Sequence, residues 1–520
     1  MPGDVLIGID SGTSVIKAVA FDLRGAQIAS SSVPNRLQSN SDGSATQDMT
    51  RTWTDCAAAL RGLAEKVSSL AERTAAISVT AQGDGTWLVG RDNRPVTDAW
   101  LWLDARAAPT VETLASGPLS RARFEATGTG LNACQQGSQM AHMERVAPGL
   151  LDAAEVALHC KDWLYLCLTG VRATDPSEAS FTFGNFRTRR YDDVVIEALG
   201  LNNRRRLLPE IVEGTQLTHP LSGAAAAETG LKAGTPVCLA YVDMVMTALG
   251  AGVCGGSSEA ACSIVGSTGV HMRAVTNAAV HLNAEGTGYV MALPIPGMVV
   301  QAQTNMAATL NLDWILGIAA ELLESAGRPV THADLLARID AWLEAGSPGQ
   351  IVYHPYISEA GERGPFVNSQ ARAGFVGLSA NHRYADLVRA VVEGLGMALR
   401  DCYLAMGGLP SELRLSGGAA RSPGLRAILA ACVGAPVRVS SREEAGAAGA
   451  AMMAAVAIGA YPDMHACIAD WVTPLLGAPK SPDPALVDVY RRLFPAFQSS
   501  RAGLPPAWSL LAAARQNTTT

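Results

Sequence analysis

Several features that would define a function class are missing from this sequence. Its 10 Cys residues form no C-x-x-C pair, so we expect no zinc site of that type. There is no long run of Lys and Arg, and the net charge is -7, so we expect no nucleic-acid partner. The most apolar segment, residues 445–460, is shorter than the ~20 apolar residues that a spanning helix needs. It is predicted to be a buried helix, and we expect no membrane partner.

The N-terminus also lacks the pattern of a signal peptide, because Asp4 and Asp10 bracket a short apolar run. The Cys residues are too sparse for a disulfide scaffold, so we expect reduced thiols and a cytoplasmic protein. Charged residues make up 17% and hydrophobic residues 48%, a balance typical of a folded globular protein.

The two halves of the chain show a similar order of strand signals. Apolar runs at 4–9 and 15–22 flank a Gly turn and predict a hairpin, and 260–265 and 270–274 repeat that arrangement. We therefore predict an α/β fold in which two related domains face each other. Further predicted elements are strands at 28–33 and 75–80 and helices at 51–70, 384–406 and 422–433.

A chain of 520 residues is too long for one compact core. The Gly/Ser-rich stretch 250–258 predicts a domain boundary. We expect an N-terminal domain at 1–252, a C-terminal domain at 253–460 and a helical extension at 461–520. Residues 515–520 are expected to form a frayed polar tail.

The turn of the first predicted hairpin could bind phosphate. It reads Asp10-Ser11-Gly12-Thr13-Ser14, and Lys17 follows. A carboxylate at a strand end can orient a Mg²⁺-bound water, while backbone N–H groups and hydroxyls hold phosphate oxygens. A plain hairpin turn, with the Asp accepting local N–H bonds, explains this motif alone about equally well.

Two further Gly-rich turns are weaker signals. Gly266-Ser267-Thr268-Gly269 suits a close approach to phosphate, although alone it reads better as an ordinary β-turn. Gly417-Gly418-Ala419 lies between a predicted strand and a predicted helix, and its missing side chains would leave a flat surface for a purine ring. Such strand–helix turns are common in α/β proteins. The order of the three turns along the chain is a more specific signal for nucleotide binding than any one turn alone.

With these motifs in view, residues 5–460 resemble the FGGY carbohydrate kinases of the actin/Hsp70/hexokinase ATPase superfamily. The turns appear as GIDSGTSVIKAVAFD, IVGSTGV and LRLSGGAARS. Three more stretches are similar to family segments: Trp102–Arg106 to W-x-D-x-R, Lys161–Asp175 to K-D-x-L…L-T-G…T-D, and Ser358–Pro365 to S-G-E-R-x-P.

The resemblance implies two actin/hexokinase-like (ribonuclease H-like) domains flanking a cleft for ATP and substrate. It implies ATP and Mg²⁺, with Asp243 as the general base and Asp10 as the metal-orienting carboxylate. A buried, paired carboxylate would be the better explanation of Asp243 without the family context. The implied ATP-binding residues are Gly12, Thr13, Ser14, Lys17, Gly266, Ser267, Thr268, Gly269, Gly417, Gly418 and Ala419.

For the acceptor, we expect hydrogen bonds from Gln82, Asp84 and Asp104, together with Asp243. Arg106 could orient a carboxylate, and a purely structural Asp104–Arg106 ion pair is nearly as good an interpretation. Trp87 and Trp102 are expected in the core.

The overall resemblance implies a small polyol acceptor, erythritol, phosphorylated at a terminal hydroxyl. Gly83-Asp84 stands where glycerol kinases carry Arg-Glu and xylulose kinases Met-His. A kinase for another sugar, such as the ketopentoses xylulose or ribulose, is the alternative.

Two other classes remain open: an actin- or Hsp70-like ATPase acting on a protein partner, and a non-catalytic sugar-binding regulator. Tyr241-Val242, where relatives often carry glycines, and Gln139, where Lys is frequent, depart from the family pattern. The assembly that we consider is a homodimer.

Overall fold

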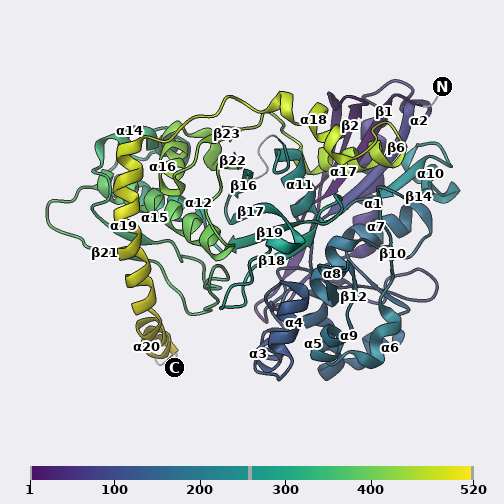
Figure 1. The fold of residues 1–520 in the computed structure, drawn as a ribbon, viewed down its shortest axis with the longest axis horizontal. Helices are drawn as coiled ribbons and strands as arrows, with labels where there is room; N and C mark the ends of the chain where they lie inside the picture. The colour runs from purple at the N-terminus through teal and green to yellow at the C-terminus, as the bar shows by residue number, and fades with distance from the viewer. Residues whose placement is uncertain (1–2, 256–259, 517–520) are drawn as a thin grey trace.

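The computed structural model describes residues 3–255 and 260–516, and Figure 1 shows two α/β halves side by side. Each half contains a six-stranded mixed sheet. The predicted α/β fold with two related domains is confirmed, because the two sheets share one construction. None of the helices in the described ranges is long and apolar enough to cross a membrane.

The N-terminal sheet is built on the first predicted hairpin. Strands β1 (Val5–Ser11) and β2 (Val15–Asp22) pair antiparallel and place Asp10 opposite Lys17. Strand β6 (Thr74–Ala81) pairs parallel with β1, so the carboxyl ends of both strands meet at one edge of the sheet. The sheet order is β14-β15-β6-β1-β2-β3, with β3 at Gln27–Pro34, β14 at Thr218–Pro220 and β15 at Pro236–Leu239.

The C-terminal sheet repeats this construction. Strands β16 (Ala260–Val265) and β17 (Gly269–Thr276) form the second predicted hairpin, and β22 (Glu412–Ser416) pairs parallel with β16. The sheet order is β18-β19-β17-β16-β22-β23, with β18 at Tyr289–Ala292, β19 at Met298–Asn305 and β23 at Val437–Val439.

The predicted helices are present; the one expected at 51–70 ends earlier, at Ala64, and the other two shift by about a residue at their ends. They are α1 (Met49–Ala64), α15 (Tyr384–Ala405) and α16 (Pro423–Val433). The other helices of the first half are α2 (Leu70–Arg73), α3 (Ala108–Ala115), α4 (Ser120–Thr127), α5 (Gln136–Val146), α6 (Pro148–Ala153), α7 (Cys160–Thr169), α8 (Pro176–Phe183), α9 (Asp193–Ala198) and α10 (Gly223–Thr229). The second half adds α12 (Thr309–Ser325), α13 (His332–Leu336) and α14 (Ile339–Ala345).

The Ala/Gly-rich segment forms a buried helix, as predicted, at α17 (Ala445–Ala457). It packs against β1 of the N-terminal sheet and against α11 (Asp243–Ala251). A Cβ on Gly8 would lie 2.0 Å from the Ala447 carbonyl oxygen, and one on Gly250 would lie 2.0 Å from that of Ala445. Only glycine at positions 8 and 250 allows β1 and α11 to approach the backbone of α17 so closely.

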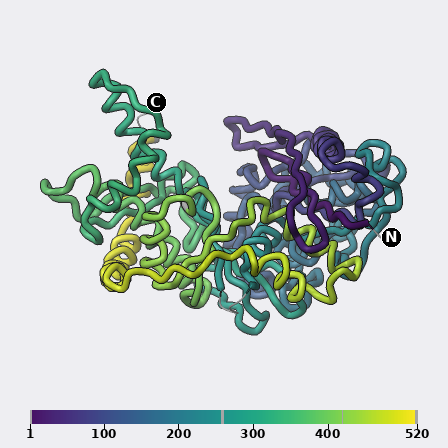
Figure 2. The backbone as a smooth tube through the Cα atoms, turned by 90° about the horizontal axis from the view of Figure 1, so that it is seen from above, coloured from purple at the N-terminus to yellow at the C-terminus, as the bar shows by residue number. Residues whose placement is uncertain are grey.

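After α17 the chain forms α18 (Met464–Trp471) and then crosses to the other half, as Figure 2 shows from above. There it forms α19 (Pro484–Gly503) and α20 (Pro505–Gln516). Of the predicted frayed tail, Arg515 and Gln516 belong to α20, and 517–520 lie outside the described residues. Residues 256–258 of the predicted boundary also lie outside them, and the division at 252 and 460 stays a prediction.

Candidate active site

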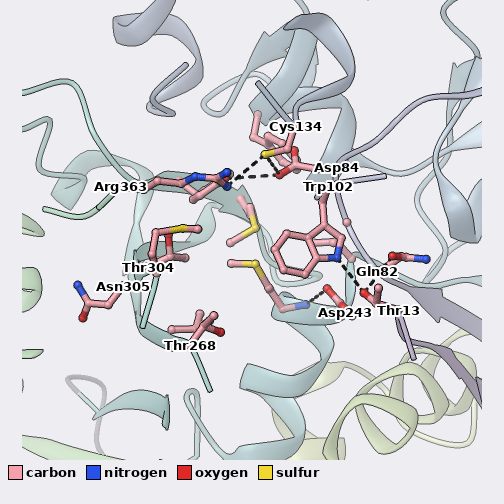
Figure 3. Close-up of a pocket in the computed structure, with 18 residues that line it drawn as sticks. Thr13, Gln82, Asp84, Trp102, Cys134, Asp243, Thr268, Thr304, Asn305 and Arg363 are labelled. Atoms are coloured by element: carbon pink, nitrogen blue, oxygen red, sulfur yellow. Dashed lines mark hydrogen bonds between the residues drawn. The ribbon is translucent and has the colours of Figure 1, made fainter. Parts of the chain in front are cut away.

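A cavity of about 220 Å³ lies between the two halves of the molecule (Figure 3). That volume is below the roughly 300–1,000 Å³ of sites for drug-sized ligands, so the cavity suits a small molecule. Its walls contain residues of the first two Gly-rich turns, which are predicted to bind phosphate, and of the predicted acceptor site. The lining residues with polar side chains are Thr13, Gln82, Asp84, Trp102, Cys134, Asp243, Thr268, Tyr289, Thr304, Asn305 and Arg363.

A chain of hydrogen bonds fixes the side chains where β1 and β6 end. The Thr13 hydroxyl donates to Gln82 Oε1 at 3.0 Å and accepts from Trp102 Nε1 at 2.8 Å. Gln82 Nε2 in turn donates to Gln47 Oε1 at 2.9 Å. The expectation that Trp102 is a core residue is wrong, because its indole lines the cavity, whereas Trp87 is fully buried as expected.

Asp243 is the first residue of α11 and lines the cavity. Its Oδ1 accepts a hydrogen bond from the Met244 amide at 2.6 Å. Burial raises the pKa of this carboxyl well above its usual range, and the negative charges of Asp10, Glu178 and Asp84 add to the effect. A carboxylate with a raised pKa is a stronger proton acceptor, the property that a general base needs.

Asp10 lies at the end of β1, near the start of α17. Burial raises its pKa to about 6, while the charge of Lys17 opposes and that of Glu444 reinforces the shift. The Lys17 ammonium is 2.7 Å from Glu444 Oε2. A Cβ on Gly446 would lie 2.2 Å from Asp10 Oδ2, so α17 leaves room for this carboxylate only by having glycine there.

Of the predicted phosphate-binding residues, Thr13 and Thr268 line the same cavity, although they come from different halves. Gly12, Ser14 and Lys17 belong to the hairpin beside it, where the Gly12 amide donates to the Val15 carbonyl at 3.0 Å. In the second turn, the Gly266 amide donates to the Thr268 carbonyl at 3.0 Å. Ser267 and Gly269 complete that turn, with Gly269 beginning β17.

The third turn borders a second cavity of about 210 Å³, which extends from the end of β22 to α11 and α17. Gly417 lines it with a φ of 87°, and a Cβ there would lie 2.7 Å from the Val265 carbonyl oxygen. Glycine is therefore required at this position. Gly418 begins a short 3₁₀ helix that includes Ala419, whose side chain lies outside the described part of the structure.

Asp84 stands at the other end of the main cavity from Asp243 (Figure 3). Its Oδ2 accepts from Cys134 Sγ at 3.4 Å and from the Tyr289 hydroxyl at 3.5 Å. Its Oδ1 is buried and has no hydrogen-bond partner among the described residues. An unpaired buried carboxylate oxygen is costly, so this cavity-lining side chain carries an unmet acceptor in the free protein.

A buried ion cluster supports both ends of the cavity. Lys161 Nζ lies 2.6 Å from carboxylate oxygens of Asp162 and Asp175 and 2.7 Å from one of Glu178. Glu178 Oε1 accepts from the Asp84 amide at 3.1 Å. The hydroxyl of Ser177, which hydrogen-bonds to Asp175, accepts from the Val242 amide at 3.0 Å. The K-D and T-D segments therefore hold the backbone beside both Asp84 and Asp243.

Asp104 does not line the cavity. Its buried carboxylate accepts from Arg106 Nη2 at 2.6 Å and from the Ala45 amide at 3.0 Å. The geometry matches the structural ion pair that the sequence left open. Gln139, one departure from the family pattern, is also structural, since it accepts from the Thr86 hydroxyl at 2.7 Å and donates to the Leu101 carbonyl at 2.9 Å.

The other departure is Tyr241-Val242, and the Val242 side chain lies directly against Gly83. A Cβ on Gly83 would lie 2.5 Å from Val242 Cγ2. Val242 thus fills the space in front of Gly83, and a larger residue at 83 would collide with it. Gly83 and Val242, the residue before Asp243, therefore depend on each other sterically.

Sequence reasoning did not select Cys134, Tyr289 and Arg363, which line the acceptor end of the cavity. Arg363 lies in the SEAGERGP loop, and that motif was the one signal that could have identified it. Cys134 and Tyr289 stand in no motif of their own.

Comparison with known proteins agrees with this geometry. The N-terminal domain of the FGGY family of carbohydrate kinases matches residues 5–250, and the C-terminal domain of that family matches residues 261–458. An erythritol kinase of Brucella abortus is 68% identical over 99% of both chains. A xylulose kinase of Escherichia coli is 29% identical over 87% of this chain and 90% of that protein.

Solved structures give the same assignment of fold. A xylulose kinase from Rhodospirillum rubrum superposes with a TM-score of 0.86 at 25% identity and covers 97% of this chain and 100% of its own. A gluconate kinase from Lactobacillus acidophilus has a TM-score of 0.87 at 21% identity, covering 98% and 99%.

Proposed function

This chain belongs to the FGGY family of carbohydrate kinases, and we propose that it transfers the γ-phosphoryl group of ATP to a terminal hydroxyl of erythritol. The observation that carries the choice of erythritol is the similarity to the Brucella erythritol kinase over nearly the whole chain. The cavity agrees with a small acceptor, because its volume is about 220 Å³ and polar groups stand at both of its ends.

In the proposed reaction, Asp243 accepts the proton of the terminal hydroxyl as that oxygen attacks the γ-phosphorus. The Met244 amide holds the carboxylate in place, and the buried environment raises its pKa. Thr13 and Thr268 reach the cavity from opposite halves and would donate to the oxygens of the transferring group. Contacts from both halves favour closure around the substrates, which excludes water as a competing acceptor.

The carboxylates at this site fit a divalent cation. Asp10 and Asp243 are buried close enough for the charge of Asp10 to raise the pKa of Asp243, and oxygen ligands are those that Mg²⁺ prefers. Asp10 is the residue proposed to orient the ion. When bound with ATP, Mg²⁺ neutralises charge on the phosphate oxygens. The second cavity, at Gly417, is proposed to receive the adenosine.

A ketopentose kinase is the second candidate function, favoured by relatives such as the xylulose kinase of Escherichia coli. That similarity of 29% is far below the 68% shared with the erythritol kinase. If the protein instead acts on a protein partner, its ATP turnover should not be stimulated by any polyol. The homodimer and the cytoplasmic location expected from the sequence also remain proposals, and light scattering in solution measures the first.

The deciding experiment is ADP release by the purified protein with erythritol, glycerol, D-xylulose and D-ribulose as acceptors. We expect kcat/KM for erythritol to exceed the others by at least about tenfold, because a pocket that pairs each hydroxyl rejects analogues that lack one. Mass spectrometry of the product should show a monophosphate of the acceptor. A tenfold preference for a ketopentose or for glycerol would contradict the erythritol assignment, and ADP release indifferent to all acceptors would favour a protein substrate.

A further inference from the structure

Four polar side chains form one end of the cavity, and we call them the distal wall: Asp84, Cys134, Tyr289 and Arg363. Asp84 and Cys134 belong to the N-terminal half, while Tyr289 on β18 and Arg363 belong to the C-terminal half. Figure 3 shows Arg363 reaching toward Asp84 and Cys134, with the Trp102 indole between this wall and Asp243. The distal wall is therefore made by both halves and lies away from the reacting end.

The loop that carries Arg363 is held rigidly at the end of β19. Glu362 Oε1 accepts from the Met306 amide at 2.9 Å and from the Arg363 amide at 2.8 Å. Asn305 Nδ2 donates to the Gly364 carbonyl at 2.7 Å. Burial raises the pKa of Glu362 to about 7. A buried acid that accepts from successive backbone amides fixes where Arg363 projects, so the guanidinium is a built part of the cavity.

The distal wall has hydrogen-bonding capacity that the protein does not use. Asp84 Oδ1 is buried without a partner among the described residues. Arg363 Nη1 is 3.7 Å from Cys134 Sγ, and sulfur is a weak acceptor for a group with five N–H donors. Asp84 and Arg363 form no ion pair within the described ranges, although the charge of each shifts the pKa of the other. The side chains of Asp84 and Arg363 thus line the same cavity, and each has hydrogen-bonding capacity that the described residues leave unused.

We propose that Arg363 and Asp84 together bind the hydroxyl group of the acceptor that is farthest from the phosphorylated one, and that Arg363 is a specificity-determining residue. An alcohol can satisfy both groups at once, since its proton goes to Asp84 Oδ1 and its oxygen accepts from Arg363. A carbonyl at that place would leave Asp84 Oδ1 unpaired, and a methyl group would leave both groups unpaired. Because the two residues belong to different halves, the bound acceptor also links those halves.

This inference deepens the proposed function and rests on it. The test compares erythritol with butane-1,2,3-triol, which lacks one terminal hydroxyl, in the wild-type protein and in Arg363→Met. Methionine keeps much of the apolar stem and removes the donors. Arg372→Met is the matched control, because Arg372 follows in the same region, pairs with Glu359 and does not line the cavity.

We expect wild-type kcat/KM to favour erythritol over the triol by at least about 10²-fold. Arg363→Met should lower kcat/KM for erythritol by roughly 10- to 10²-fold and that for the triol by less than about twofold, so the preference shrinks. The KM for ATP and the values for Arg372→Met should stay within about twofold of wild type. Arg363→Lys, which keeps the cation without the fork, should fall between wild type and Arg363→Met.

An unchanged preference in Arg363→Met, or an equal loss with both acceptors, would overturn the proposal. Should Arg363→Met fail to fold, Arg363→Lys is judged by the same ratio. If the wild-type protein prefers a ketopentose, the erythritol assignment fails by itself. The same comparison is then made with that sugar and its analogue lacking the remote hydroxyl, and its outcome decides on Arg363 separately.

Discussion

Replacing Lys161 by methionine tests how the buried ion cluster supports the cavity. The ammonium is fully buried and lies 2.6 to 2.7 Å from three carboxylates that are themselves buried. Lys161→Met removes the ammonium and leaves the His159 imidazole, 3.3 Å from Asp162 and 3.6 Å from Glu178, as the neighbour that can offset those charges. Removing one partner of a buried ion pair typically costs ~3–5 kcal/mol. For domains of this size each kcal/mol shifts the melting temperature by about 2–4 °C, so we expect a fall of roughly 6–20 °C.

The pH dependence of this loss distinguishes charge from packing. Burial already raises the pKa of Glu178 to about 7, and Lys161 opposes that shift, so removing Lys161 must raise it further. A carboxyl whose pKa is higher in the folded than in the unfolded protein destabilises the fold as pH rises through the folded value. The stability difference from wild type should therefore be largest near pH 8 and smallest near pH 5.

Differential scanning fluorimetry across this pH range measures the effect, with the exposed Lys232→Met as control. A loss below about 1 kcal/mol at pH 8 would show that the cluster does not need its cation. A loss of equal size at pH 5 and pH 8 would show that lost packing, rather than charge, destabilises the variant.

Three further predictions concern single carboxylates. Asp243→Asn should lower kcat by ~10²–10⁴-fold and leave the KM for ATP within about threefold, because the amide keeps the shape of the carboxylate but cannot accept the proton. If the variant keeps half of the wild-type kcat in steady-state assays, Asp243 is not the general base. Asp10→Asn should abolish Mg²⁺-dependent turnover yet raise the melting temperature at pH 7. The wild-type carboxyl has a folded pKa of about 6 against 3.8 unfolded, so ionising it destabilises the fold above that pH, and the gain should vanish near pH 4. Asp104→Asn should lower the melting temperature while changing KM for erythritol less than about threefold, and a larger KM change without a stability loss would restore Asp104 to the acceptor site.

Local patterns in the sequence were sufficient for the framework of the fold. Both hairpins were predicted because each joins two apolar runs through a Gly turn, which is a short-range signal. The buried helix α17 was predicted from its composition alone. What composition did not reveal is where α17 packs: it lies on the N-terminal sheet, although it follows the C-terminal sheet in the chain. That position depends on backbone contacts at Gly8 and Gly250, which only the folded structure brings together.

In the candidate site, too, the sequence predicted the residues that stand in motifs but not those that depend on long-range contacts. Thr13 and Thr268 were predicted from turns whose order is typical of the family, and Asp243 from the resemblance to that family; all three line one cavity. Asp104 was ambiguous from the sequence because an Asp two residues before an Arg suits a structural pair as well as a ligand contact. Arg363 and Tyr289 reach the cavity from the other half. The SEAGERGP motif marks the loop of Arg363, but no local pattern indicates that either side chain makes this long-range approach.

The concentration of acids around the cavity connects stability with function. Glu178 is buried and Asp10, Asp84 and Asp243 are half-buried, and loss of contact with water raises the pKa of each. A fold optimised only for stability would not gather four desolvated carboxyls with one nearby lysine cluster. In the proposed reaction a cation pairs with Asp10, a remote hydroxyl with Asp84 and the reacting proton with Asp243, while Glu178 accepts from the Asp84 amide within the protein. Ligands that supply those partners bind the folded protein alone, so acceptor and nucleotide should stabilise the chain in proportion to how many of these carboxyls they pair.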